Sequence, residues 1–479
     1  MSEAQPSGQA RRDAEQRSQT AGLDALRSTL FWRGDAGYEE ARVGRVFNAR
    51  RPDRYPAAVL MAESEADVVA GVRLARERGL QVSVRAGGHS WAAWSVRDDV
   101  LLIDLEGMRE ITYDPDTGIA TAGPAVRGGA ELVPFLTSRG RAFPGGHCPG
   151  VGLGGFLLQG GQGWNSRRHG WACENVVGID VVTADGELVH ADSEQNADLL
   201  WAARGAGPGF FGVITRFHLR TFPRPATMTH DTWMFELDEL EALLGWIDDM
   251  LPSLDTVVEP VIAATRLPRP SGPPVLLLHT TAMCDSGEEA ERVLAPLSEC
   301  PIAGRAISHQ RGPTTIELEN EAQALQNPEE HRYAVDCTWT DARAEELAPL
   351  LRAVWSELPT EHSFAIWYGW APTRPLPDMA FSIEGRAYLA TYAIWPDPAD
   401  DERHGDWVVG HARRLANAVG KGVYLGDTDF TRRPDRFLSE ENFRRLEDIR
   451  RARDPDELFC SYLIAEGATL NGAPARSLL

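Results

Sequence analysis

Two glycine-rich stretches carry the side chains with the most evident chemistry. Residues 85–90 read RAGGHS and follow a short apolar run, and the paired glycines let the backbone approach a ligand closely. Residues 146–155 read GHCPGVGLGG and hold a cysteine among glycines. Imidazole and thiolate are both good nucleophiles, so His89 and Cys148 are the first candidates for chemistry.

The second stretch also contains a GxGxxG pattern, at residues 150–155. A nicotinamide-binding fingerprint must follow a buried strand and open a helix. Here the preceding residues, 143–149, read FPGGHCP and form a loop with two prolines. We therefore predict a glycine-rich turn at this position and no Rossmann site.

A strand–helix–strand unit positions the first motif. Apolar residues 58–61 predict a strand, Ser64 and Gly79 are typical of the start and stop of a helix, and residues 82–84 predict the strand that runs into the motif. Further short strands are expected in the following stretches: 100–105, 111–113, 119–122, 176–183, 188–190 and 211–215. Residues 176–190 read as a hairpin.

The middle of the chain has a different pattern. From residue 229 to 429, amphipathic helices are expected at 236–250 and 342–358, together with strands such as 275–278. A last helix is expected at 439–454, ended by Pro455. The pattern predicts a glycine-rich lobe, a second lobe and a closing helix.

Charge and composition exclude several classes of function. The net charge of −22 would repel nucleic acid, and the single lysine, Lys421, lacks the phosphate loop of a Walker motif. Six cysteines without a close pair argue against a zinc knuckle and a disulfide framework, so we expect no metal and a reducing, cytoplasmic location. No apolar run approaches the ~18 residues of a membrane span, so no membrane partner is expected.

Three stretches together resemble one family. With RGAG at 204–207, the motifs at 85–90 and 146–155 are similar to those of the berberine bridge enzyme-like branch of the vanillyl-alcohol oxidase/p-cresol methylhydroxylase flavoproteins. The resemblance runs from about Phe47 to Pro223 and returns at 442–459. It implies an α+β fold, in which a two-lobed flavin-binding domain is joined by an α/β substrate domain and a C-terminal return.

The resemblance also implies domain boundaries. They are a flexible tail at 1–25, an FAD-binding domain at 26–225, a substrate-binding domain at 226–429 and a C-terminal segment at 430–479 that returns to the FAD-binding domain.

The cofactor implied by the resemblance is FAD attached twice, through His89 to the flavin 8α-methyl group and through Cys148 to C6. A positive or amide-rich surrounding would favour the thiolate of Cys148. Gly87, Gly88 and Ser90 would offer donors to the pyrophosphate. The other cofactor-binding residues expected are Arg85, Ala86, Gly146, Gly152, Leu153, Gly155 and Val213.

The resemblance does not identify a catalytic base, because the two positions that often carry functional side chains in the family are altered in this sequence. Thr391 stands where family members have Glu or Gln on a flavin-facing strand. Gly426 and Asp427 replace the Asn-x or Asn-Tyr of another family segment, where a tyrosine can act as base. Tyr388, Tyr392 and Asp427 are therefore the candidates. The alternatives are that the tyrosines pack the lobe interface and that Asp427 is a turn residue.

The function implied is oxidation of an alcohol, amine or activated C–H of a small molecule, with molecular oxygen as acceptor. Val151 lies at the family position that gates oxygen, or else packs the glycine loop. Aromatic residues at 364–395 favour an aromatic or natural-product-like substrate, or the core of an antiparallel sheet. The rival functions are a flavin dehydrogenase with another acceptor and a flavoprotein that sequesters a natural product.

Overall fold

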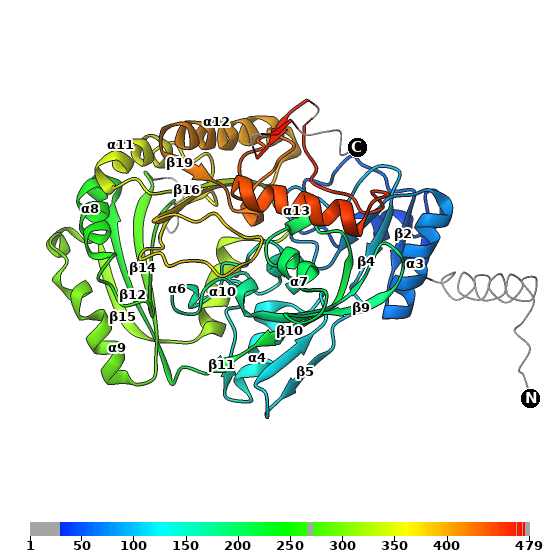
Figure 1. Cartoon of the computed structure of the whole chain (residues 1–479). Helices are drawn as coiled ribbons and strands as arrows, with labels where there is room; N and C mark the ends of the chain where they lie inside the picture. The colour runs from blue at the N-terminus through cyan, green and yellow to red at the C-terminus, as the bar shows by residue number, and fades with distance from the viewer. Residues whose placement is uncertain (1–28, 267–271, 466, 472, 475–479) are drawn as a thin grey trace, which may run out of the picture.

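The computed structural model describes residues 29–479, except 267–271, 466, 472 and 475–479. The tail expected at 1–25 lies outside the described residues. Figure 1 shows two smaller sheets in the blue to green part of the chain and a larger sheet in the green to orange part. No helix of the described ranges is both long and apolar enough to cross a membrane.

A four-stranded sheet carries the first glycine motif. Its strands, in spatial order, are β1 (Leu30–Trp32), β2 (Ala58–Met61), β4 (Leu101–Asp104) and β3 (Val82–Arg85), with β4 parallel to both β2 and β3. The helix α3 (Glu65–Arg78) joins β2 to β3. It begins at Ser64, whose hydroxyl accepts from the Asp67 amide, and ends at Gly79 in the left-handed conformation, as predicted. The motif leaves the carboxyl end of β3, where α/β sheets bind ligands.

A five-stranded antiparallel sheet lies next in the chain. Its spatial order is β5 (Ile111–Asp114), β6 (Ile119–Ala122), β10 (Val213–Arg220), β8 (Val176–Val182) and β9 (Leu188–Ala191). The antiparallel pairing of β8 with β9 confirms the predicted hairpin. The second glycine motif enters the short helix α5 (Leu153–Leu158) from a loop, without the strand that a Rossmann site requires.

The middle of the chain forms an eight-stranded antiparallel sheet. The strands, in spatial order, are β15 (Ser308–Thr314), β12 (Thr227–Glu236), β14 (Val275–Cys284), β13 (Val258–Thr265), β17 (Phe364–Gly369), β18 (Ala387–Trp395), β16 (Arg332–Thr340) and β19 (Gly420–Gly422). Helices run along its outer side (Figure 1), namely α8 (Leu240–Met250), α9 (Gly287–Leu294), α11 (Ala344–Trp355) and α12 (Asp401–Val419). Helix α10 (Ile316–Gln326) lies on the inner side.

Tertiary pairing moves several predicted boundaries. The helix expected at 236–250 begins at Leu240, because β12 keeps its register with β14 as far as Glu236. The strand expected at 275–278 extends to Cys284, because it is paired on both sides. The helix expected at 342–358 spans 344–355.

Further short elements are α2 (Tyr38–Val43), α4 (Val133–Thr137), α6 (Ser166–His169), α7 (Ala197–Ala203), β7 (Arg141–Ala142), β11 (Phe222–Pro223), β20 (Thr469–Leu470) and β21 (Ala473–Pro474).

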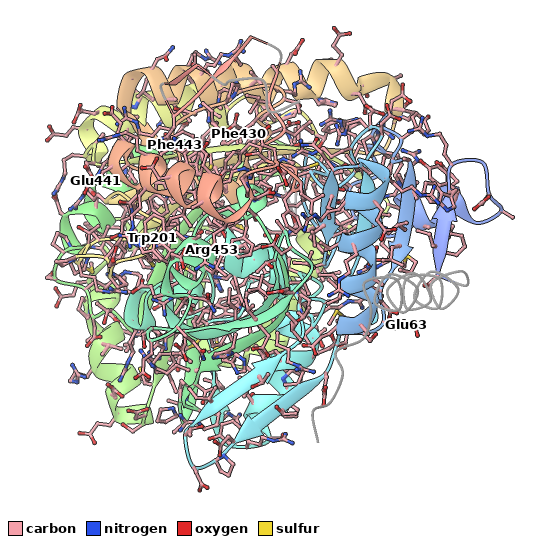
Figure 2. All side chains as sticks on the ribbon, turned by 45° about the vertical axis from the view of Figure 1, so that its right-hand side comes forward. Glu63, Trp201, Phe430, Glu441, Phe443 and Arg453 are labelled. Atoms are coloured by element: carbon pink, nitrogen blue, oxygen red, sulfur yellow. The ribbon has the colours of Figure 1, made fainter. Side chains whose placement is uncertain are left out.

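The C-terminal segment returns to the first lobe. The helix α13 (Glu440–Arg453) crosses α7, where Arg453 pairs with Asp198 at 2.7 Å and the Arg445 guanidinium lies 4.1 Å from the ring centre of Trp201. Figure 2 shows Trp201 and Arg453 close together at this crossing. After the helix, the Cys460 amide donates to the Val82 carbonyl of β3 at 2.9 Å. The exact boundaries drawn between domains stay predictions.

Candidate active site

A cavity of about 660 Å³ lies between the two glycine motifs and the inner face of the eight-stranded sheet. One wall is formed by residues 85–90 and 146–152, and the facing wall by side chains of β13, β14, β17 and β18. Small-molecule and cofactor sites commonly measure about 300–1,000 Å³. Both motifs therefore open into one cavity of suitable size.

His89 lines the cavity with its ring held in place. The imidazole stacks on Phe47, with ring centres 4.6 Å apart and planes 16° apart. On another side lies Gly150, where an added Cβ would come 3.0 Å from His89 Nε2. Burial, with the charges of Arg127 and Arg45, lowers the pKa of His89 to about 4. The imidazole is therefore neutral at physiological pH, as a nucleophile requires.

Cys148 is a free thiol on the wall of the same cavity. Burial raises its pKa to about 12, and the negative charge of Asp427 acts in the same direction. Burial and this negative charge therefore both disfavour the thiolate of Cys148.

The two motifs pack against each other through their backbones. A Cβ on Gly87 would lie 2.5 Å from the amide nitrogen of Gly152, and a Cβ on Gly152 would lie 2.7 Å from Gly87 Cα. Gly88 has a φ of +74°, which favours glycine. At Gly155 an added Cβ would meet no atom within 4 Å. Exposed backbone thus forms this wall, which suits an extended phosphate-bearing group held by amides.

The other expected cofactor-binding residues separate into two groups. Those that line the cavity are Arg85, Ala86, Gly87, Gly88, Ser90, Gly146, Gly152 and Gly155. Leu153 and Val213 do not: both are fully buried in the apolar core, and the neighbours Gly212 and Ile214 face the cavity in place of Val213. Their side chains therefore point away from the cavity, for Val213 because side chains alternate along the strand, and their role in cofactor binding stays a prediction.

Arg85 supports the loop through its side chain. Its guanidinium pairs with Asp104 at 2.5 Å and donates to the backbone carbonyls of Ala41 and Arg42. The residue is 2% exposed. It therefore fixes the end of β3, and only its backbone is left for a cofactor.

The three candidate base residues meet at one carboxylate. The Tyr388 hydroxyl donates to Asp427 Oδ2 at 2.5 Å, and the Tyr392 hydroxyl donates to the same oxygen at 2.9 Å. Trp91 Nε1 donates to Oδ1 at 2.8 Å. All four residues line the cavity. The sequence did not single out Trp91, although it directly follows the RAGGHS motif.

The pKa shifts within this cluster distinguish the proton acceptor from the hydrogen-bond donors. Burial raises the pKa of Asp427, and the hydrogen bonds from Tyr388, Trp91 and Tyr392 oppose that rise in part. Burial and the charge of Asp427 raise the pKa values of both tyrosines well above the ordinary value. The tyrosines are therefore hydrogen-bond donors, and Asp427 is the group of the cluster that can accept a proton.

Thr391 does not occupy a cavity-facing position. Tyr388, Ala390 and Tyr392 belong to the apolar cluster on the inner face of β18, whereas Leu389 packs on the helix-covered face. Thr391 lies two residues after Leu389, so its side chain is on the same helix-covered face, and it is 3% exposed. The prediction that Thr391 stands at the flavin-facing position is wrong, and Ala390 is the residue between the two tyrosines on that face.

Further polar residues on the sheet-side wall were missed from the sequence. Glu259 of β13 accepts from the Tyr368 hydroxyl at 3.0 Å and the Asn165 amide at 2.9 Å, and burial raises its pKa. Glu319 of α10 lies 3.1 Å from His279. A polar residue within an otherwise apolar strand is the signal that could have indicated Glu259, whereas Glu319 lies in a polar helix that gave no such signal.

The aromatic stretch 364–395 is divided between the cavity wall and the core of the sheet. Phe364 and Tyr368 line the cavity, whereas Trp367 packs under the outer helices. Val151 also lines the cavity.

Comparison with known proteins agrees with this geometry. Residues 56–192 match the family described as "FAD binding domain". The chain is 36% identical over 436 residues to the FAD-linked oxidoreductase ptmO of Penicillium ochrochloron, covering 90% of this chain and 96% of that protein. It is 38% identical over 205 residues to a xylooligosaccharide oxidase of Thermothelomyces thermophilus, covering 42% of this chain and 39% of that protein.

Among solved structures, BBE-like 1 of Physcomitrella patens superposes with a TM-score of 0.80 at 20% identity, covering 92% of this chain and 98% of that one. This superposition confirms the predicted fold class, and the fold and the matched domain together define an FAD-binding flavoprotein. This chain belongs to the FAD-linked oxidoreductases, the family of the relative from Penicillium ochrochloron. It is an oxidoreductase with FAD as cofactor.

Proposed function

We propose that this protein is an FAD-dependent oxidase that carries its flavin on both His89 and Cys148 and uses Asp427 as the catalytic base. The substrate is a small, aromatic or natural-product-like alcohol, amine or activated C–H compound. The observation that carries the proposal is that Asp427, with its three donors, lines the same cavity as His89 and Cys148. The sheet-side wall thus presents a proton acceptor to the flavin-side wall.

The residues present fit a flavin. Backbone at Gly87, Gly88 and Gly152 supports a close approach, and His89 is a neutral nucleophile. His89 would hold the flavin at the 8α-methyl group and Cys148 at C6. When bound, the flavin supplies a two-electron acceptor for the substrate hydride.

Asp427, the proposed base on the sheet-side wall, has a raised pKa and a fixed orientation. A general base works best when its pKa lies near the working pH, and burial moves the pKa of Asp427 upward from the ordinary range. The two tyrosine hydroxyls and the Trp91 indole fix the carboxylate in orientation. The tyrosine hydroxyls would stabilise the charged carboxylate of Asp427 before the reaction, and Asp427 would then take the proton that the substrate loses.

The wall around Asp427 supports the proposed class of substrate. It combines apolar and aromatic side chains, such as Val261, Phe364 and Ile366, with a few polar groups such as Glu259 and His279. Small-molecule sites commonly combine an apolar surface with a few orienting polar groups. Oxygen as acceptor is supported by the short side chain of Val151 on the cavity wall and by the relative named as an oxidase. A cytoplasmic location stays a proposal from the sequence.

The test is anaerobic mixing of the flavin-loaded protein with panels of aromatic alcohols, benzylic amines and oligosaccharides, followed by exposure to air. We expect one panel to bleach the flavin absorbance, and air to restore it with one peroxide formed per flavin. Bleaching without reoxidation by air would support the dehydrogenase alternative. A compound that binds tightly, shown by a spectral shift, without bleaching would support the sequestering alternative.

A further inference from the structure

Two histidines and an aspartate converge on the five-stranded sheet, apart from the flavin cavity. His190 of β9 pairs across the strands with Asp180 of β8, and His218 lies on β10, on the other side of β8. His190 Nδ1 lies 2.6 Å from Asp180 Oδ1, and His218 Nε2 lies 3.3 Å from the same oxygen. One donor atom from each residue lies within 4.8 Å of the others.

Gly178 makes this convergence possible. A Cβ at Gly178 would lie 3.2 Å from the His190 ring and 3.4 Å from the His218 ring. The ring centres are 5.1 Å apart, at an interplanar angle of 75°. Any larger residue at position 178 would push the imidazoles apart, so the glycine leaves the space in which their nitrogens meet Asp180.

Each imidazole also has a partner on the ring nitrogen that does not face Asp180. His218 Nδ1 lies 3.2 Å from the Thr121 hydroxyl, and His190 Nε2 lies 3.4 Å from Asp192 Oδ2. These contacts direct His218 Nε2 and His190 Nδ1 toward Asp180. Histidine ligands of metals commonly have such an outer partner, which fixes the tautomer and the ring orientation.

We propose that Asp180, His190 and His218 form a binding site for a divalent transition-metal ion, with zinc as the best match. Two imidazole nitrogens and one carboxylate oxygen are ligands that zinc accepts, with water in the remaining position. The side chains of His190, His218 and Asp180 are 37%, 25% and 18% exposed, so an ion and its water have access. The three residues come from strands at 176–182, 188–191 and 213–220, which explains why the close-spacing patterns of zinc motifs gave no signal.

A neighbouring cation competes with the ion. Arg216 lies 3.8 Å from Asp180 Oδ2 and 3.1 Å from Glu65 Oε1. Because Glu65 is the nearer partner, Arg216 can remain paired while Asp180 turns to the ion. Removing this positive charge in Arg216→Gln is expected to strengthen metal binding.

The site joins three strands of the flavin lobe, but its three residues are absent from the cavity lining. A bound ion would stabilise the folded protein by mass action and leave the chemistry of the flavin unchanged.

The test is calorimetric titration of the flavin-loaded protein, freed of metal by chelator, with ZnCl₂ at neutral pH, together with the visible spectrum after addition of CoCl₂. We expect one zinc per chain, a raised melting temperature, and the intense cobalt bands of a low-coordinate site. His190→Asn and His218→Asn should each abolish the cobalt bands, and Asp192→Asn should weaken binding roughly 10-fold or more.

His309→Asn is the matched control, because His309 also pairs with an aspartate across strands, at 2.8 Å from Asp231. It should leave binding unchanged, and flavin absorbance should report that each variant is folded. The proposal is overturned if zinc does not bind in saturable fashion, or if it binds equally well to His190→Asn and His218→Asn with their flavin content intact.

Discussion

The two walls of the cavity are built in opposite ways. The flavin-side wall consists largely of backbone from two short stretches, in which glycines at 87 and 152 touch. The sheet-side wall consists of side chains from strands spread between residues 258 and 395, joined by the loop at Asp427. One wall depends on the absence of side chains and the other on the alternation of side chains along strands.

This difference in construction corresponds to two functions, cofactor binding on one wall and substrate binding on the other. A cofactor that is the same throughout a family needs a fixed backbone cradle, so changes on the flavin-side wall should affect flavin loading and folding. A substrate that differs among relatives needs replaceable side chains on rigid strands. Changes on the sheet-side wall should therefore affect reaction rates and spare the flavin.

The largest expected effect comes from the base. Asp427→Asn should slow anaerobic flavin reduction by substrate by about 10²–10⁴-fold, the usual contribution of a general base, with flavin content unchanged. Stopped-flow absorbance measures the rate. Asp429→Asn, two residues along the same loop and outside the cavity lining, is the control and should be near normal. An unimpaired Asp427→Asn would remove the functional distinction between the walls.

The rate of flavin reduction should depend on pH through the titration of Asp427. Burial raises the pKa of Asp427, and a base works only when deprotonated, so the reduction rate should level off above that pKa. Below it, the rate should fall roughly tenfold per pH unit. The profile of Tyr392→Phe should shift to higher pH, because one hydrogen bond to the carboxylate is lost. An unchanged profile in this variant would assign the titration to another residue.

The sequence predicted the flavin-side wall far better than the sheet-side wall. His89, Cys148 and the glycines stand in contiguous motifs, and their cavity position follows from local turns. Tyr388, Tyr392 and Asp427 could be suggested, but only the pairing of β18 and the fold of the 424–427 loop bring them together. Thr391 was misplaced by one residue of strand register, which reverses the face of a side chain. Glu259 and Glu319 depend on long-range packing and left only weak signals.

On the flavin-side wall, Gly87→Ala should destabilise the protein by about 1–3 kcal/mol, the usual range for overpacking, because the new Cβ meets the Gly152 amide at 2.5 Å. Urea unfolding measures the loss. Gly155→Ala is the contrasting variant, since its Cβ meets nothing within 4 Å and alanine favours the helix. It should keep its stability and lose flavin content. Equal stability in both variants would contradict the backbone contact.

The smallest effect concerns oxygen. Val151→Leu should slow reoxidation by air several-fold and leave anaerobic reduction near normal, because one extra methylene narrows the cavity beside Cys148. Double-mixing stopped-flow separates the two steps. Val261→Leu, on the facing wall, should instead change reduction by substrate. If Val151→Leu reoxidises at the normal rate, Val151 is a packing residue.

The most direct test of the account is whether the flavin is attached at both His89 and Cys148. Intact mass spectrometry of the acid-denatured protein, followed by peptide mapping, reads this without any knowledge of the substrate. We predict one FAD per chain on a cross-linked pair of peptides containing residues 89 and 148, one remaining link in His89→Ala or Cys148→Ala, and none in the double variant. The single-link proteins should also have lower flavin potentials. Release of all the flavin from the unmodified protein on denaturation would show that neither His89 nor Cys148 holds it covalently.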